Sequence, residues 1–514
     1  MLQPGKSYRA LICDLKFTSP ILSRRSVEKW RKGRILYVCA NASSAADTYT
    51  RVKKDTLLHS NLRMLQLRNR TDFSAHQTAS LCLGVCFPGV ALECLSNYGT
   101  FFDDLSLVVF DDLHLLDSEY EMLILRVLEC SRHANTRIIG CASSLYDGVD
   151  LAEWLRVPDS GRFLFRPTDR STALTTVVQP FSIPHSPTLM KSMVKPVYAA
   201  IKANLQEGAI VFVPSKAQCR SVAMDLITRS GMEMDLNGFL PQTGFELEPF
   251  VSQLREKQLV EPLLHGIGMW WEGLPYKDSI FVLQLFAAGV LRALIVPRES
   301  CWTLKAQAGA VIVMGAQYVE VRPFKPSERI PDKKIRNYTL QELVKMQAFA
   351  ARPRPETAAT RNHVGDATGR FYLLCQSEQQ EIYLKFLNEG LPLESSLVGT
   401  LQRKAQVSSI AALHDMLDDV ATWTEHVLHK PRQPTRQDFM DILSWSFLAK
   451  RIRSNPIYYD AALGLESERL SRLVDGFLVS YFEMKKATQR KVGNGTENDV
   501  VEATETAEEP RQLD

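Results

Sequence analysis

The sequence has no long hydrophobic run and no secretory signal, which excludes two classes of protein. No stretch of about 18 uncharged apolar residues, the length of a membrane-spanning helix, occurs in the 514 residues. The opening segment, MLQPGKSYRALICDLK, lacks the charged start, apolar core and small-residue cleavage site of a secretory leader. We therefore expect a soluble intracellular protein with no membrane partner.

The ten cysteines are not arranged as metal ligands or as a disulfide framework. No C-x-x-C pair occurs, and Cys39, Cys82, Cys141 and Cys375 lie in apolar runs, which predicts reduced thiols in the core. Cys82 and Cys86 lie close together, but no matching Cys/His pair occurs elsewhere, so we do not expect a zinc site. The net charge of +3 neither demands nor excludes a nucleic-acid partner.

Short apolar runs alternate with amphipathic segments over most of the chain. The runs that predict buried parallel strands are Arg34 to Ala40, Leu107 to Phe110, Arg137 to Ala142, Ala209 to Val213, Ala293 to Val296, Val311 to Met314 and Phe371 to Cys375. Segments such as Tyr120 to Cys130 and Ala217 to Thr228 have helical periodicity. This alternation predicts βαβ units, and the length suits roughly three or four domains.

The composition changes at two places along the chain. The Pro-containing stretch from Phe165 to Pro187 is predicted to join two α/β units, and helical periodicity dominates from Leu391 onward, with one amphipathic segment from Phe439 to Arg453. The last residues, from Gly493 to Asp514, are rich in carboxylates and have no aromatic residue. Such a segment cannot bury enough apolar area to order itself, so we predict a disordered acidic tail.

Two carboxylates stand at the end of one predicted strand, in Leu107-Val-Val-Phe-Asp111-Asp112-Leu-His114. That position is the carboxyl edge of a parallel sheet, where α/β proteins bind ligands. In a nucleotide hydrolase the first carboxylate holds Mg²⁺ and the second orients the attacking water. The alternative interpretation is that the pair begins a turn and caps the next helix.

The tripeptide Gly5-Lys6-Ser7 precedes a segment, Tyr8 to Lys16, that we predict to be helical. In a phosphate loop the lysine reaches the β/γ-phosphates of ATP and the serine hydroxyl binds Mg²⁺. We therefore take Gly5, Lys6 and Ser7 as candidate ATP-binding residues, and Ser7 with Asp111 as candidate Mg²⁺ ligands. The first glycine of a full loop and the strand before it would precede Met1, and chance also accounts for such a short match.

Two further motifs follow the acidic pair, Cys141-Ala142-Ser143-Ser144 and Lys345-Met-Gln-Ala-Phe-Ala-Ala-Arg352-Pro353. In this order, the motifs resemble those of one cassette of a superfamily 2 DExH-box RNA helicase of the Ski-like branch. Among these, the chain first resembles the inactive C-terminal cassette of the spliceosomal tandem-cassette helicases, and second the tandem helicases of the activating signal cointegrator complex.

Other segments resemble this family's pattern. They are Val211 to Lys216, Gly266 to Leu274, Ala293 to Trp302, and the winged-helix start and end at Leu391 to Leu397 and Asn455 to Tyr459. The resemblance implies an α/β fold: two RecA-like parallel-sheet domains at 1–175 and 176–390, an α-rich winged helix at 391–484 and a disordered acidic tail at 485–514.

The departures from the family's pattern weaken the catalytic site that the resemblance assigns to Asp111, Asp112 and Arg352. Asp112 replaces a glutamate, and a displacement of about 1 Å at a reacting centre can cost on the order of 10²-fold in rate. Phe349 replaces one of two arginines, a loss of roughly 10³ to 10⁵ in related enzymes. Trp271 stands in place of a histidine, and the Trp270-Trp271 pair is expected to serve domain packing.

These departures lead us to expect a degenerate helicase cassette. The resemblance to the family's inactive cassette implies a scaffold or regulator, with protein partners in a nuclear RNA-processing complex and the spliceosome as its first candidate. ATP and Mg²⁺ are its only expected cofactors, if any. Two alternatives stay open: an active RNA helicase with divergent motifs or a missing start, and a switch that holds ATP without hydrolysing it. RNA contact is expected at most through two basic segments, Arg322, Lys325, Arg329, Lys333, Lys334 and Arg336, and Lys485, Lys486, Arg490 and Lys491.

Overall fold

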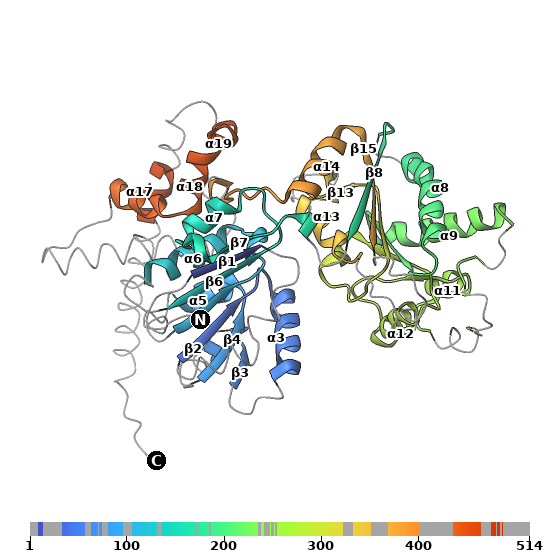
Figure 1. Cartoon of the computed structure of the whole chain (residues 1–514), viewed down its shortest axis with the longest axis horizontal. Helices are drawn as coiled ribbons and strands as arrows, with labels where there is room; N and C mark the ends of the chain where they lie inside the picture. Colours follow the sequence, from blue (N-terminus) through green and yellow to red (C-terminus); the bar gives the residue numbers. More distant parts are fainter. Residues whose placement is uncertain are drawn as a thin grey trace, which may run out of the picture.

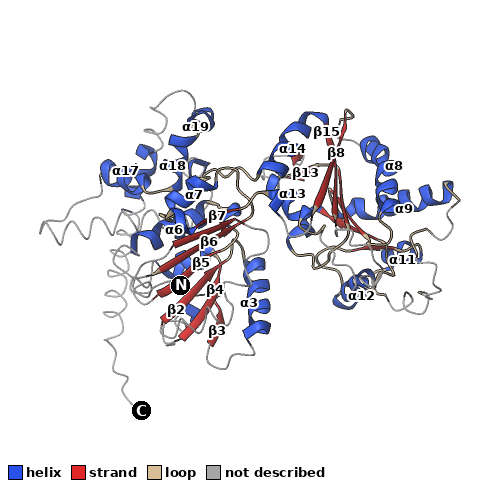
Figure 2. Cartoon of the chain, in the orientation of Figure 1, coloured by secondary structure: helices blue, strands red, loops and turns tan. Residues whose placement is uncertain are grey.

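The computed structural model of the chain has two parallel-sheet domains and a smaller group of helices (Figures 1 and 2). It describes residues 9–13, 33–56, 63–69, 71–73, 81–95, 105–130, 136–169, 173–184, 187–234, 238–240, 247, 251, 254–321, 333–350, 368–399, 435–463, 474–479, 481–483 and 486.

The first domain is built on a seven-stranded sheet with the strand order β3-β4-β2-β5-β6-β1-β7. All neighbouring strands pair in parallel. The strands are β1 Arg9–Cys13, β2 Gly33–Val38, β3 Arg63–Gln66, β4 Leu81–Cys86, β5 Leu105–Phe110, β6 Arg137–Ala142 and β7 Arg162–Leu164. The helices are α3 Ala42–Thr56, α5 Pro88–Leu95, α6 Ser118–Cys130 and α7 Gly148–Trp154.

The central strands of this sheet are buried on both faces. In β2, Leu36 and Val38 pack in the core that α5 and α6 contribute to, whereas Ile35 and Tyr37 pack in the core beside α3. This alternation follows because successive side chains of a strand point to opposite faces. Figure 1 shows α3 on one side of the sheet and α5 and α6 on the other. Helices on both faces explain why the strands read as continuous apolar runs.

The second domain is built on a six-stranded parallel sheet with the order β10-β11-β9-β12-β15-β8. Its strands are β8 Leu174–Phe181, β9 Ala209–Val213, β10 Ile267–Met269, β11 Ala293–Pro297, β12 Ala310–Met314 and β15 Gly369–Gln376. Its helices are α8 Pro187–Ala203, α9 Lys216–Met232, α11 Val260–Leu264, α12 Tyr276–Ala287, α13 Leu340–Gln347 and α14 Gln380–Glu389. An antiparallel pair, β13 Gln317–Val321 and β14 Lys333–Asn337, lies between β12 and α13 in the chain.

The seven strands predicted from the sequence are all confirmed, but the helix predicted from Tyr8 to Lys16 is wrong. Arg9–Cys13 forms strand β1, which pairs with β6 on one side and β7 on the other. The apolar run Ala10 to Cys13 suits an interior strand of a parallel sheet, and this long-range pairing overrides the local helical pattern.

Two other expectations need correction. The stretch from Phe165 to Pro187 is more than a linker, because it contains strand β8 of the second sheet. The amphipathic segment from Phe439 to Arg453 is two helices, α17 Arg436–Ser444 and α18 Phe447–Ser454. The break occurs because the Ser446 hydroxyl accepts the Ala449 N–H (3.2 Å) and so starts a new helix.

The helices α17, α18 and α19 (Pro456–Leu463), called the C-terminal helices below, pack on the first domain (Figure 1). Arg451 of α18 is 2% exposed and donates to Glu394 through Nη2 (2.6 Å) and Nε (3.1 Å). The same guanidinium pairs with Asp150 and with Asp147 (3.1 Å) of the first domain. One arginine therefore joins the C-terminal helices to two other parts of the chain.

The two predicted winged-helix signatures meet in space. Asn455 Nδ2 and Tyr459 Oη each donate to the Glu394 carboxylate at 2.8 Å, and the Ser395 N–H donates to Tyr459 Oη at 2.8 Å. Most of the segment between the signatures, including residues 400–434, lies outside the described residues. The helix-rich region is therefore confirmed, and a winged helix remains a prediction. The predicted acidic tail also lies outside the described residues, apart from Lys486.

A second carboxylate, Glu121 of α6, is buried at the same junction. It accepts hydrogen bonds from the Ser395 hydroxyl (2.6 Å) and from the Leu448 N–H (2.9 Å) at the start of α18. A carboxylate at this end of a helix also meets the positive end of the helix dipole. Among the described helices, none is long and apolar enough to cross a membrane.

We predict that Arg451→Ala will lower the free energy of unfolding by about 1.5–3 kcal/mol, because the half-buried carboxylates of Glu394 and Asp147 lose a charged donor. Urea denaturation monitored by tryptophan fluorescence measures this loss. The matched change two residues away, Arg453→Ala, removes an exposed arginine of the same helix. It should cost no more than about 0.5 kcal/mol. Equal losses in the two variants would contradict the proposed role of Arg451.

Candidate functional site

The acidic pair lies at the carboxyl end of β5, where the chain leaves the middle of the first sheet. β5 runs between β2 and β6, and the Asp111 N–H still donates to the Val38 carbonyl of β2 (2.8 Å). Asp111 is 7% exposed. The predicted position of Asp111 and Asp112 at the edge of the sheet is therefore observed.

Both oxygens of the Asp111 carboxylate have donors within the protein. The Tyr37 hydroxyl donates to Oδ2 at 2.6 Å, and the Asp112 N–H donates to Oδ1 at 2.9 Å. Burial and the neighbouring Asp112 charge raise the pKa of Asp111 to about 6, although both hydrogen bonds oppose this rise. The carboxylate is therefore held by donors of the chain itself, and the nearby positive charge of Arg51 also opposes the rise of its pKa.

Asp112 has left-handed backbone geometry, with φ 54° and ψ 35°. This conformation is strained for a residue with a side chain and is often found near functional sites. Asp112 begins the 3₁₀ turn Leu113–Leu115, but its side chain does not cap that turn. Burial raises the pKa of Asp112, and the positive charges of Lys345 and Arg51 oppose the rise.

The acidic pair and the motif from Cys141 to Ser144 are adjacent in space. The Ser143 N–H donates to Nδ1 of His114 at 3.2 Å, and the Ser143 hydroxyl lies 3.4 Å from Nε2. Burial lowers the pKa of His114 to about 4, so the imidazole is neutral near pH 7. One neutral histidine, His114, thus joins the residues that follow β5 to those that follow β6 by hydrogen bonds.

Two described residues of the motif from Lys345 to Pro353 lie in different surroundings. Lys345 belongs to α13, and its charge acts on Asp112 and His114 of the first domain. Phe349 is 9% exposed, and its ring lies 5.8 Å from that of Phe212 in the core of the second domain. The position that the resemblance gives to an arginine is thus filled by a core side chain.

The remaining predicted site residues, Gly5, Lys6, Ser7 and Arg352, lie outside the described residues. Of the predicted set, the structure places only Asp111 and Asp112 together. Within the part of the chain that the structure describes, no group of three or more His, Cys, Asp or Glu side chains could hold a metal ion. Each oxygen of Asp111 has one donor within the protein, and the other candidate Mg²⁺ ligand, Ser7, lies outside the described residues, so Mg²⁺ binding stays a prediction.

Two tyrosines at this site were not predicted from the sequence. Besides Tyr37, the Tyr120 hydroxyl donates to the Asp111 carbonyl at 2.6 Å, and its ring meets Phe110 edge-on. The available signal was a lone tyrosine in the otherwise aliphatic run of β2, because a buried hydroxyl requires a hydrogen-bond partner.

The predicted packing role of the two tryptophans is confirmed. Trp270 and Trp271 are 8% and 4% exposed, and Trp270 Nε1 donates to the Ser279 hydroxyl at 2.8 Å. The Lys216 ammonium lies 4.6 Å from the centre of the Trp271 ring. These rings are therefore not open platforms for base stacking.

The two predicted basic segments are described only in part. Lys333, Lys334 and Lys486 are exposed, and Arg336 pairs with Glu320 at 2.9 Å. Arg322, Lys325, Arg329, Lys485, Arg490 and Lys491 lie outside the described residues. RNA contact through these segments stays a prediction.

Comparison with known proteins finds relatives that are named as helicases or as a splicing factor. The chain is 31% identical over 391 residues to the DExH-box ATP-dependent RNA helicase DExH12 of Arabidopsis thaliana. It is 30% identical over 387 residues to the U5 small nuclear ribonucleoprotein 200 kDa helicase of Homo sapiens, and 32% over 380 residues to the pre-mRNA-splicing factor brr2 of Schizosaccharomyces pombe. These matches cover 74%, 72% and 71% of this chain but only 16%, 16% and 15% of the relatives. The chain thus spans a small part of their length.

No family model matches the chain. Among solved structures, the Escherichia coli DEAH/RHA helicase HrpB superposes with a TM-score of 0.49 at 14% identity, over 80% of this chain and 48% of that one.

The raised pKa of Asp111 predicts a pH-dependent effect of Asp111→Asn. Because the folded pKa lies above the unfolded value, the folded state binds more protons, and Asp111 lowers stability as pH rises from about 4 to about 6. The variant should therefore gain stability over the wild type across this window, by about 1.4 kcal/mol for each unit of pKa shift removed. Urea denaturation at several pH values measures the difference, with the exposed-charge variant Glu389→Gln as control. A difference that does not change with pH would contradict the assignment.

Proposed function

Because the chain belongs to the DExH-box helicase family, we propose that it is a degenerate helicase cassette that binds proteins and does not turn over ATP. Its setting is a nuclear RNA-processing complex, with the spliceosome as first candidate, since two of the relatives are named for a small nuclear ribonucleoprotein and for splicing. Protein binding is its main property, and RNA affinity is secondary.

The environment of Phe349 is the observation on which this proposal mainly rests. In phosphoryl transfer, an arginine stabilises the charge of the transition state. Here the corresponding side chain is a phenylalanine packed against Phe212. Restoring an arginine would place a guanidinium among apolar side chains, and burying an unpaired charge costs several kcal/mol. Replacing Phe349 by arginine would therefore not by itself restore an active site, because the new charge would be buried without a partner.

The acidic pair supports the same proposal. The Tyr37 hydroxyl and the Asp112 N–H each occupy one acceptor site on the Asp111 carboxylate, so a Mg²⁺-bound water would have to share it with these donors. Asp112 is one methylene shorter than the glutamate that the resemblance leads us to expect, and Phe349 removes a second catalytic group. Losses of this kind do not simply multiply, but all of them reduce the rate of hydrolysis.

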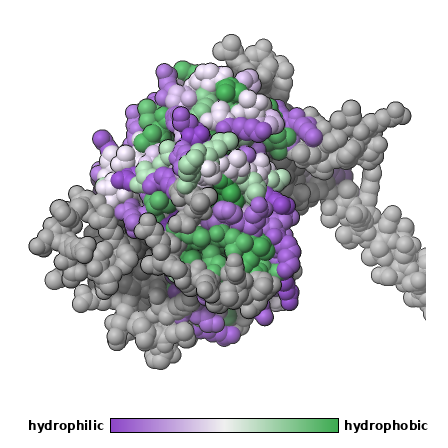
Figure 3. Space-filling model, turned by 90° about the vertical axis from the view of Figure 1, so that its right-hand side faces the viewer, coloured by the Kyte–Doolittle hydropathy of each residue, from purple (hydrophilic) through white to green (hydrophobic). Residues whose placement is uncertain are grey.

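The fold itself is well preserved around this altered site. Both domains keep buried cores of apolar side chains. Figure 3 shows a hydrophobic area on the side of the second domain, with hydrophilic residues above it and to its right. Apolar areas with a polar rim are typical of protein-binding surfaces. A fold that has lost its catalytic residues can still bind partners on its surface, because function resides in sites rather than in architecture.

Affinity capture from nuclear extract tests the scaffold directly. A stable protein interface should survive at about 200 mM salt, whereas binding through phosphate contacts weakens steeply between about 50 and 200 mM. We expect RNA-processing proteins to be recovered at the higher salt whether or not ribonuclease is present. Recovery that disappears with the RNA would show that RNA binding, and not protein binding, is the main property.

We also predict no RNA-stimulated ATPase activity above that of a Lys6→Ala control, because the water-activating and arginine positions are both altered. Asp112→Glu alone should not restore activity, since Phe349 remains. Phosphate release measured with and without RNA checks both statements. A turnover near 1 per second, the low end of typical enzymes, that Lys6→Ala abolishes would instead support an active helicase.

A further inference from the structure

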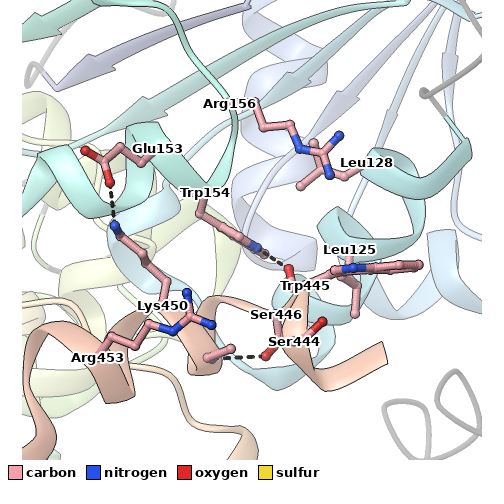
Figure 4. Close-up of a pocket in the computed structure, with 11 residues that line it drawn as sticks. Leu125, Leu128, Glu153, Trp154, Arg156, Ser444, Trp445, Ser446, Lys450 and Arg453 are labelled. Atoms are coloured by element: carbon pink, nitrogen blue, oxygen red, sulfur yellow. Dashed lines mark hydrogen bonds and ion pairs between the residues drawn. The ribbon is translucent and has the colours of Figure 1, made fainter. Parts of the chain in front are cut away.

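A pocket of about 320 Å³ lies where the first domain meets the C-terminal helices (Figure 4). Its walls come from α6, from α7 and Arg156 just after it, and from α17, α18 and the two residues that join them. The residues that matter here are Leu125, Leu128, Trp154, Arg156, Trp445 and Arg453. None of them belongs to the altered catalytic site.

The floor of the pocket is apolar and firmly held. Leu125, Leu128 and Trp154 are 1%, 5% and 8% exposed. Trp154 Nε1 donates to the Trp445 carbonyl at 2.7 Å, and its ring packs at 5.2 Å from that of Phe447. These contacts fix the two halves of the pocket relative to each other, so an entering side chain meets a preformed surface.

The rim is basic. Arg156 and Arg453 are exposed, and neither has an ion pair within the described part of the chain. Lys450 also lines the pocket but is paired with Glu153 (Figure 4). The lining therefore carries three cations and one carboxylate, which leaves two guanidinium groups for an anionic partner.

Arg156 occupies a backbone position that favours glycine. Its φ is 55°, its N–H donates to the Glu153 carbonyl at 2.9 Å, and the Val157 N–H donates to the Ala152 carbonyl at 2.8 Å. This pair of hydrogen bonds defines a Schellman ending of α7, in which the left-handed residue is usually glycine. A side chain there costs roughly 1–2 kcal/mol. A strained arginine at the mouth of a pocket is thus a second, independent indication of a binding role.

We propose that this pocket binds an acidic peptide segment of a partner protein. The carboxylates of the segment pair with Arg156 and Arg453, and one of its apolar side chains lies on the floor formed by Leu125 and Leu128. Paired guanidinium–carboxylate contacts give both affinity and orientation. A pocket of this volume is at the small end of ligand sites, large enough for a few side chains.

A nucleic-acid strand fits this pocket less well. Glu153 lies within the lining, and Asp147 and Asp150 lie beside it in contact with Arg451 and Lys450. These carboxylates repel phosphates, whereas a peptide can present carboxylates at the two arginines and uncharged groups elsewhere. The inference rests on the proposed protein-binding function and names one of its contact sites.

The probe is a fluorescein-labelled peptide with two carboxylate side chains, Gly-Ser-Asp-Leu-Phe-Asp-Ser-Gly, titrated with the full chain and followed by fluorescence anisotropy. We expect saturable binding that Arg156→Gly and Arg453→Ala each weaken by about tenfold or more, the loss expected for one charge-assisted hydrogen bond. Arg156→Gly should leave the melting temperature unchanged or raise it, because glycine relieves the left-handed backbone. Weaker binding with intact stability therefore separates recognition from folding.

Met234→Gly is the matched control, since Met234 is an exposed residue with the same φ of 55° after α9. It should leave peptide binding unchanged. No saturable binding, or binding that neither arginine variant weakens, would overturn the proposal. The proposal would also be overturned if a uridine oligonucleotide bound through the two arginines and the peptide did not.

Affinity capture with the Arg156→Gly chain separates this inference from the proposed function. Ribonuclease-resistant partners that persist while the peptide fails to bind would leave the scaffold in place and remove the pocket. Loss of one partner in parallel with loss of peptide binding supports both.

Discussion

Buried and half-buried carboxylates need hydrogen-bond or ionic partners inside the protein, and three of them, half-buried Glu394 and buried Glu121 and Asp111, organise this molecule. Glu394 is held by Arg451, Asn455 and Tyr459, and Glu121 accepts bonds from Ser395 and the start of α18. These contacts fix the C-terminal helices on the first domain. Asp111, the third, is held by Tyr37 and the Asp112 N–H. In all three cases the partner is a group of the chain itself.

Under the proposed function, the same constraint explains how a helicase fold can keep its shape without its chemistry. An acidic group left unpaired at a sheet edge would need a cation or water, but Asp111 is satisfied by protein donors. Phe349 contributes to the core where the resemblance leads us to expect an arginine. Both arrangements keep the buried groups partnered, and under the proposed function both remove a catalytic contact. The preserved architecture, together with the junction between the first domain and the C-terminal helices, is then available to bind other proteins.

Much of this arrangement could be predicted from the sequence. Continuous apolar runs located the central strands, and their ends placed Asp111 and Asp112 at the edge of the sheet. The error at Arg9–Cys13 arose because a short apolar segment has no period that distinguishes strand from helix, and only pairing with β6 and β7 decides. The Tyr37 bond to Asp111 could not be predicted, since it joins residues 74 positions apart. The left-handed geometry of Arg156 likewise depends on where α7 ends.

The central claim is that this site no longer uses Mg²⁺ to bind and hydrolyse ATP. The most direct test is an equilibrium titration of the chain with labelled ATP, in Mg²⁺ and in EDTA, on the wild type and on Asp111→Asn. The account predicts that Mg²⁺ does not strengthen nucleotide binding and that the substitution has no effect on it. Saturable binding that requires Mg²⁺ and is lost in Asp111→Asn would contradict the account.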